Sequence, residues 1–97
     1  MPAIHARVQT DHASRYLQQL CKHWSHRFAV EFDPAHGVIH LTGADCILDA
    51  DSDALRMELR ATDPEMLPRM GDVVAEHLKR FAFREELSVA WSATPEA

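Results

Sequence analysis

The stretch of residues 10–28, TDHASRYLQQLCKHWSHRF, constrains the fold most, because it is the clearest amphipathic helix in the chain. Apolar side chains recur in it every three or four residues and form one stripe: Ala13, Leu17, Leu20, Cys21, Trp24 and Phe28. Thr10 is a favourable N-cap residue. A second stripe beside the apolar one holds His12, Tyr16, Gln19, His23 and His26. Such a helix needs a sheet or further helices on which to bury its apolar face.

Short alternating segments supply that sheet. Apolar and polar residues alternate in five places, which predicts strands with one wet face and one buried face: residues 4–8, 30–32, 38–41, 45–50 and 55–61. Residues 33–37, DPAHG, are turn-forming, so residues 29–42 are predicted to form a hairpin with His40 facing outward. A last strand is predicted at residues 87–91. The clean alternation favours an antiparallel sheet covered on one side only.

A second amphipathic helix is predicted after the fifth strand. Thr62 and Glu65 have capping-box spacing, and Pro68 and Gly71 are unfavourable inside a helix, so the regular helix is expected to begin near Pro68. Its apolar stripe is Leu67, Met70, Val74, Leu78 and Phe81. The predicted fold class is α+β: a two-layer sandwich with a mainly antiparallel sheet, two helices on one face, and the order β-α-β-β-β-β-α-β. Residues 1–97 are expected to form one domain, with residues 93–97 frayed.

Composition excludes several functional classes. The 97-residue chain has a formal charge of −5 and no basic block, which argues against nucleic acid as a partner. The beginning of the sequence lacks the apolar run of a signal peptide, and no segment is long and apolar enough to span a membrane. Cys21 and Cys46 lie in apolar patterns without CxxC spacing, so we expect buried, reduced thiols in a cytoplasmic protein.

Histidines are the candidate site residues. His23 and His26 are three residues apart, so their imidazoles can point the same way and ligate a transition metal such as iron or zinc. The alternative is that both are solvated at a helix C-terminus, where positive charge is favourable. His77 borders the second apolar stripe, either as a hydrogen-bonded core histidine or as a ligand.

Two further groups of residues each allow two interpretations. Residues 81–85, FAFRE, either present Arg84 to a ligand or form the packed joint after the second helix. Residues 45–53 contain four aspartates, but the calcium-loop pattern fails because Ala54 replaces the required glycine and Arg60 the closing glutamate. A solvated strand face and an aspartate-rich turn are the simpler interpretation of this cluster.

The sequence resembles a bacterial family, domain of unknown function 2218, over residues 3–91. The resemblance is carried by ARVQT, ASRYLQQLCKHWSHRF, VEFD, the strand CILDA and VVAEHLKRFAFREEL. In that family the stretch corresponding to residues 22–27, KHWSHR, usually follows K-H-[FW]-x-H-[KR]. The family's Gly-rich lead into the Cys46 strand is shorter here.

This resemblance implies a setting in bacterial iron handling, because family members are similar to a module found beside siderophore-interacting flavin reductases. The expected function is a non-enzymatic accessory module that binds a small ligand, a metal complex or a partner reductase. The implied site comprises His23, His26, Arg27, His77 and Arg84, and His12 lies on the same side of the first helix.

Two alternatives stay open at this point. The first is a small metal-dependent lyase, since some members carry an aldolase label, although 97 residues cannot build the large barrel of such aldolases. The second is a structural interaction domain. The sequence favours a binding module over an enzyme, and exposed sheet edges favour a homodimer.

Overall fold

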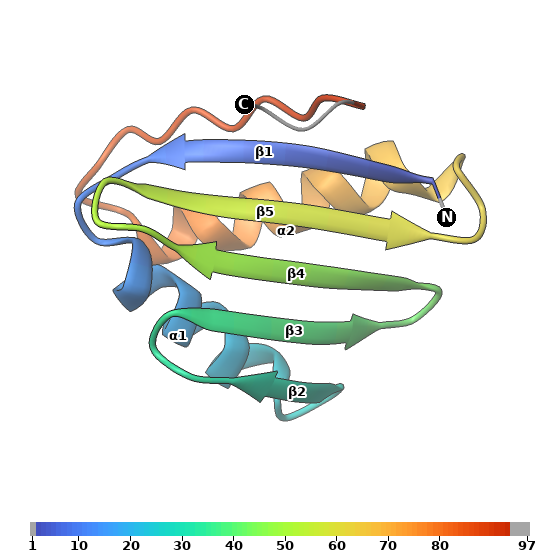
Figure 1. Cartoon of the computed structure of the whole chain (residues 1–97), viewed down its shortest axis with the longest axis horizontal. Coiled ribbons are helices and arrows are strands. Elements are labelled where there is room, and N and C mark those ends of the chain that lie inside the picture. Colours follow the sequence, from blue (N-terminus) through green and yellow to red (C-terminus); the bar gives the residue numbers. More distant parts are fainter. Residues whose placement is uncertain (1, 94–97) are drawn as a thin grey trace.

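A five-stranded sheet forms one layer of the protein and two helices form the other (Figure 1). The computed structural model describes residues 2–93. The elements in chain order are β1 (Ala3–Gln9), α1 (Ala13–Trp24), β2 (Ala29–Phe32), β3 (His36–Leu41), β4 (Ala44–Ala50), β5 (Ala54–Ala61) and α2 (Met66–Phe81). The strands lie in the order β1-β5-β4-β3-β2, and every neighbouring pair is antiparallel. The predicted α+β sandwich is confirmed.

The strand alternation places the core as expected. On β5, Leu55, Met57 and Leu59 are buried, whereas Arg56 and Arg60 are exposed on the other face. Helix α1 packs against β2, β3, β4 and β5, and α2 packs against β1 and β5. Both helices therefore cover one face of the sheet, and the other face carries the polar half of each strand. Within residues 2–93, no helix is long and apolar enough to cross a membrane.

Helix α1 is shorter than the sequence pattern predicts. It runs from Ala13 to Trp24, and its N-cap residue is His12 rather than Thr10. The Thr10 hydroxyl instead accepts the backbone N–H of His12 at 3.1 Å and donates to Glu85 Oε1 at 3.1 Å. Phe28, predicted within the helix, follows it in a turn and is half-buried against the core. The expected N-cap was wrong because the hydroxyl bonds a distant carboxylate that the local pattern does not contain.

Helix α2 begins at Met66, two residues earlier than expected, so Pro68 falls in its first turn, where proline is tolerated. The capping box is not formed; the Asp63 carboxylate accepts the Glu65 backbone N–H at 3.0 Å instead. Gly71 has a packing reason, since a Cβ there would lie 2.8 Å from Trp91 Nε1. A residue that weakens an isolated helix thus allows the end of the chain to pack closely on α2.

The predicted last strand, residues 87–91, is not a strand. It runs beside β1 (Figure 1), and the next residue, Ser92, makes an isolated bridge with His5. The Trp91 indole N–H donates to the Gly71 carbonyl at 3.1 Å and so ties the segment to α2 as well. Of the tail predicted to fray, residue 93 is described and residues 94–97 lie outside the described residues.

A cationic and aromatic cavity between the two helices

The candidate site is a cavity where the end of α1 meets the middle of α2. It measures about 570 Å³, within the size range of small-molecule sites. His23 and Trp24 come from the last turn of α1, and His77 comes from α2. The remaining lining residues follow α1 or belong to β3 and α2: His26, Arg27, Phe28, Leu41, Met70 and Val73.

Aromatic rings pack against one another along one wall of this cavity. The His77 ring centroid lies 4.8 Å from the Trp24 ring and 5.2 Å from the His23 ring. His23 also lies 5.7 Å from the Phe81 ring, which it meets edge-on. Arg27 lies over the Phe28 ring at 5.9 Å. Because Trp24 is buried and His23 is exposed, the wall extends from the core to the surface.

The hydrogen bond made by His77 fixes its ring orientation. Nδ1 lies 2.7 Å from the Val73 carbonyl oxygen. A carbonyl oxygen only accepts, so Nδ1 carries the proton and Nε2 of the neutral ring keeps its lone pair. His77 was expected to be either a hydrogen-bonded core histidine or a ligand. It is hydrogen-bonded and half-buried, and it also lines the cavity.

The electrostatics of the cavity differ from those of the whole chain. The chain has a formal charge of −5, yet no aspartate or glutamate is found among the described residues that line the cavity. The lining contains one arginine and three histidines. A site of this composition attracts anions, and its aromatic wall suits a ligand with a flat apolar surface.

Four of the five predicted site residues therefore come together: His23, His26, Arg27 and His77. Arg84 does not join them. It follows α2 and lies 5.4 Å over the ring of Phe83, which is 78% exposed. His12 lies at the opposite end of α1, where its ring meets that of Tyr16 at 6.2 Å.

The donor groups do not form an enclosed metal centre. Within residues 2–93, no group of three or more His, Cys, Asp or Glu side chains is placed to hold a metal ion. Structural zinc sites use four protein ligands and catalytic ones use three. The hypothesis that His23 and His26 ligate iron or zinc stays a prediction.

The apolar walls of the cavity were missed as functional residues at the sequence level. Trp24, Phe28 and Met70 were assigned to the core stripes, and Val73 to neither stripe. A signal was present, because Met70, Val73 and His77 are spaced by three and four and so share one face of α2. The same spacing predicts both core and ligand-lining faces.

A second polar cluster, also missed, lies at the other end of α1. Glu85 accepts hydrogen bonds from the hydroxyls of Tyr16 and Thr10. Burial, and then the Glu85 contact, raise the pKa of Tyr16 to about 12. The hydrogen bond from Tyr16, assisted by Thr10 and by His12 nearby, lowers the pKa of Glu85. These groups satisfy one another and connect the segment after α2 to the beginning of α1.

Both cysteines, Cys21 and Cys46, are buried and form no disulfide, as expected. Burial raises the pKa of Cys21 to about 11, and burial together with the nearby Cys21 raises the pKa of Cys46 further. The thiolate is the reactive form of cysteine, so these environments suppress nucleophilic chemistry at neutral pH.

Comparisons with known proteins agree with the resemblance seen in the sequence. The profile of a family described as uncharacterized protein conserved in bacteria, DUF2218, matches residues 5–92. The chain belongs to this family. A search of curated proteins found no match.

A solved structure gives a second, independent similarity. The chain is similar to PA4090 from Pseudomonas aeruginosa, whose structure was determined by NMR. The two are 41% identical over 95% of this chain and 96% of that chain, with a TM-score of 0.79. This DUF2218 protein thus has a fold that is also seen experimentally in a bacterial relative.

Proposed function

We propose that this DUF2218 protein is a non-enzymatic binding module that takes up a small anionic, aromatic ligand in the cavity between α1 and α2. The observation that carries the proposal is the composition of the lining. His23, His26, Arg27 and His77 gather beside Trp24 and Phe28, and none of the described lining residues is acidic.

The ligand class that fits the proposed iron-handling setting is a ferric chelate of the catecholate type. Such a complex is anionic and presents flat aromatic rings. The Arg27 guanidinium supplies positive charge, and the rings of His23 and His77, whose centroids lie 5.2 Å apart, offer an aromatic surface. A siderophore-interacting flavin reductase is the proposed partner that would reduce the iron, which explains why the module itself needs no reaction centre.

The test is a titration of the full chain with the ferric complex of dihydroxybenzoate, followed by tryptophan fluorescence and calorimetry. The gallium complex serves for amide NMR. We expect saturable binding that shifts amides at the end of α1 and the middle of α2. Free dihydroxybenzoate, ferric citrate and zinc alone are the comparison ligands, because they separate the aromatic, anionic and metal contributions.

The decisive variant is His23→Ala with His26→Ala, compared with His36→Ala with His40→Ala. Each pair removes two exposed histidines, but the second pair lies on the opposite face of the sheet. We expect the first pair to weaken binding roughly tenfold or more and the second to leave it within about twofold. Equal binding in both variants would remove the site assignment. Failure of every anionic probe to bind would remove the proposed function.

A further inference from the structure

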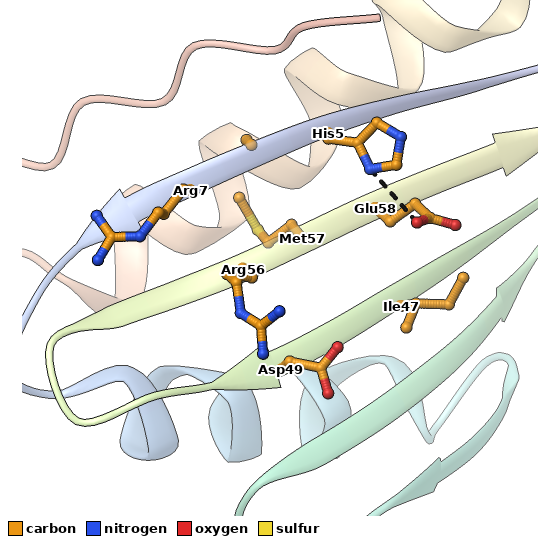
Figure 2. Close-up of a pocket in the computed structure, with 8 residues that line it drawn as sticks. His5, Arg7, Ile47, Asp49, Arg56, Met57 and Glu58 are labelled. Carbon is orange, nitrogen blue, oxygen red and sulfur yellow. Dashed lines mark ion pairs between the residues drawn. The ribbon is translucent and has the colours of Figure 1, made fainter. Parts of the chain in front are cut away.

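A second cavity lies on the face of the sheet that the helices leave uncovered. It measures about 190 Å³ and is lined by side chains of β1, β4 and β5 (Figure 2). Its polar lining residues are His5, Arg7, Asp49, Arg56 and Glu58. We propose that this cavity binds a small aliphatic α-amino acid, with its carboxylate on Arg7 and Arg56 and its ammonium group on Glu58 and Asp49.

The cationic side of the cavity is built from two arginines on neighbouring strands. Arg7 of β1 is the direct cross-strand partner of Arg56 of β5. Like charges in that position destabilise a sheet. Their aspartate partners lie in the exposed turn between β4 and β5: Arg7 Nη2 is 3.5 Å from Asp53, and Arg56 Nε is 2.8 Å from Asp51. Exposed pairs of this kind contribute little to stability, so the two guanidinium groups can exchange these partners for a ligand carboxylate.

The anionic side is equally defined. Glu58 Oε1 lies 3.3 Å from His5 Nδ1, and the other oxygen of Glu58 accepts from Arg60 Nε. Asp49 Oδ1 lies 2.6 Å from His36 Nδ1 (Figure 2 shows the His5–Glu58 pair). Asp49 is the cross-strand partner of Arg56, and Glu58 is two residues from Arg56 on the same face of β5. Neighbouring positions on one sheet face are about 5 Å apart across strands and about 7 Å apart along them. Opposite charges at this spacing match the two charged groups that an α-amino acid carries on one carbon.

The size and the apolar patch restrict the ligand further. A volume of about 190 Å³ is below the range of roughly 300–1,000 Å³ typical of drug-sized ligands. Half-buried Ile47 lines the cavity between the charged groups, and its cross-strand partner in β3 is the half-buried Val38. This surface suits a short aliphatic side chain such as that of alanine or valine.

Ligands with only one charge fit this lining less well. A simple oxyanion placed between the arginines lies close to Glu58, which is two residues from Arg56 on β5. A simple amine placed between the carboxylates lies close to Arg56, which pairs with Asp49 across the strands. A zwitterion satisfies both groups at once. The cavity lies on the opposite side of the sheet from the one between the helices, so the two sites are tested independently.

The experiment is an amide NMR titration of the full chain with L-alanine, propionate and ethylamine. Propionate lacks the ammonium group of alanine, and ethylamine lacks its carboxylate. We expect alanine to shift amides of β1, β4 and β5 and to bind at least about tenfold more tightly than either comparison ligand. If propionate or inorganic phosphate binds as tightly as alanine, or if no probe gives saturable shifts, the proposal is overturned.

Variants test each side of the cavity. Arg7→Gln with Arg56→Gln removes the carboxylate site, and Glu58→Gln weakens the ammonium site. Each is expected to lower alanine affinity about tenfold, whereas Arg69→Gln, exposed in the first turn of α2, should change nothing. The thermal midpoint of each variant is measured first. If one variant fails to fold, the other still decides the outcome, and unchanged alanine affinity in a folded variant contradicts the assignment.

Discussion

The two ends of helix α1 use polar side chains in opposite ways. At its beginning, the hydroxyls of Tyr16 and Thr10 both donate to Glu85, so the polar groups of this cluster are hydrogen-bonded to one another. At its end, His23 and Arg27 line a cavity in which no acidic residue is found among the described lining residues. Polar groups that satisfy one another stabilise the fold, whereas polar groups left facing a cavity are available to a ligand.

The difference follows from what each end packs against. The beginning of α1 meets the segment after α2, where Glu85 is held by the turn in which its own N–H bonds the Ala82 carbonyl at 3.0 Å. The end of α1 meets the middle of α2, which contributes Met70, Val73 and His77. We therefore expect substitutions at the two ends to separate stability from binding.

The largest effect on stability is expected from Tyr16→Phe. Tyr16 is only 4% exposed, and the change removes a hydrogen bond to a charged group while keeping the ring in place. The expected loss in unfolding free energy is about 1–3 kcal/mol, measured by urea denaturation. Affinity for anionic probes at the helix cavity should stay at the wild-type value, and a parallel loss of affinity would contradict the separation of the two ends.

A pH dependence of stability follows from the same residue. Tyr16 has a pKa raised to about 12, so its contribution is fully present below the unfolded-state value of about 10 and is lost as pH rises toward 12. The chain has a single tyrosine, so tyrosinate absorbance reports Tyr16 alone. We expect a native titration midpoint near 12, and no loss of stability specific to this interval in Tyr16→Phe.

At acid pH the dependence of stability on pH has the opposite sign, which provides the control. The pKa of Glu85 is lowered in the folded state, so its contribution is present above the unfolded-state value of about 4.3 and is lost as pH falls through the folded value. In Glu85→Gln, urea denaturation should show a weaker acid dependence than in the wild type. If the unfolding free energy of Glu85→Gln depends on acid pH as that of the wild type does, the Glu85 carboxylate does not stabilise the contact with Tyr16 and Thr10.

The smallest effect on stability is expected from His23→Ala with His26→Ala. Both side chains are exposed, so the unfolding free energy should change by less than about 0.5 kcal/mol, measured under the same denaturation conditions as Tyr16→Phe. A large loss of unfolding free energy would mean that the histidines at the end of α1 stabilise the fold as much as the Tyr16–Glu85 contact at its beginning. That result would weaken the proposed function. A small change in unfolding free energy together with weaker probe binding would show that the two ends of α1 serve stability and binding separately.

The strand pattern was the most predictable part of this molecule. Alternation at residues 55–61 places Leu55, Met57 and Leu59 in the core because successive strand residues point to opposite faces, a rule that depends only on backbone geometry. The strand faces were predictable because neighbours within one element determine them. His23 and His26 both line one cavity as well, but helical spacing is not the reason, because α1 ends at Trp24 and His26 lies in the turn that follows.

The errors involve residues whose partners are distant in the sequence. Thr10 and Tyr16 bond Glu85, which lies 75 and 69 residues away along the chain. Trp91 donates to Gly71, 20 residues away on α2, and residues 87–91 do not form the predicted strand. The sequence gives no local sign of these contacts, because each depends on how complete elements pack.

By itself, the sequence of this protein determined the periodicity of its elements, and with it the α+β sandwich and the wet and dry faces of each strand. Only the tertiary structure decided which polar groups satisfy one another and which face a cavity. Periodicity depends only on residues that are close in the sequence, whereas hydrogen bonding between elements depends on how those elements are placed relative to one another. That placement closes the cluster around Glu85 and opens the cavities at His77 and Arg56.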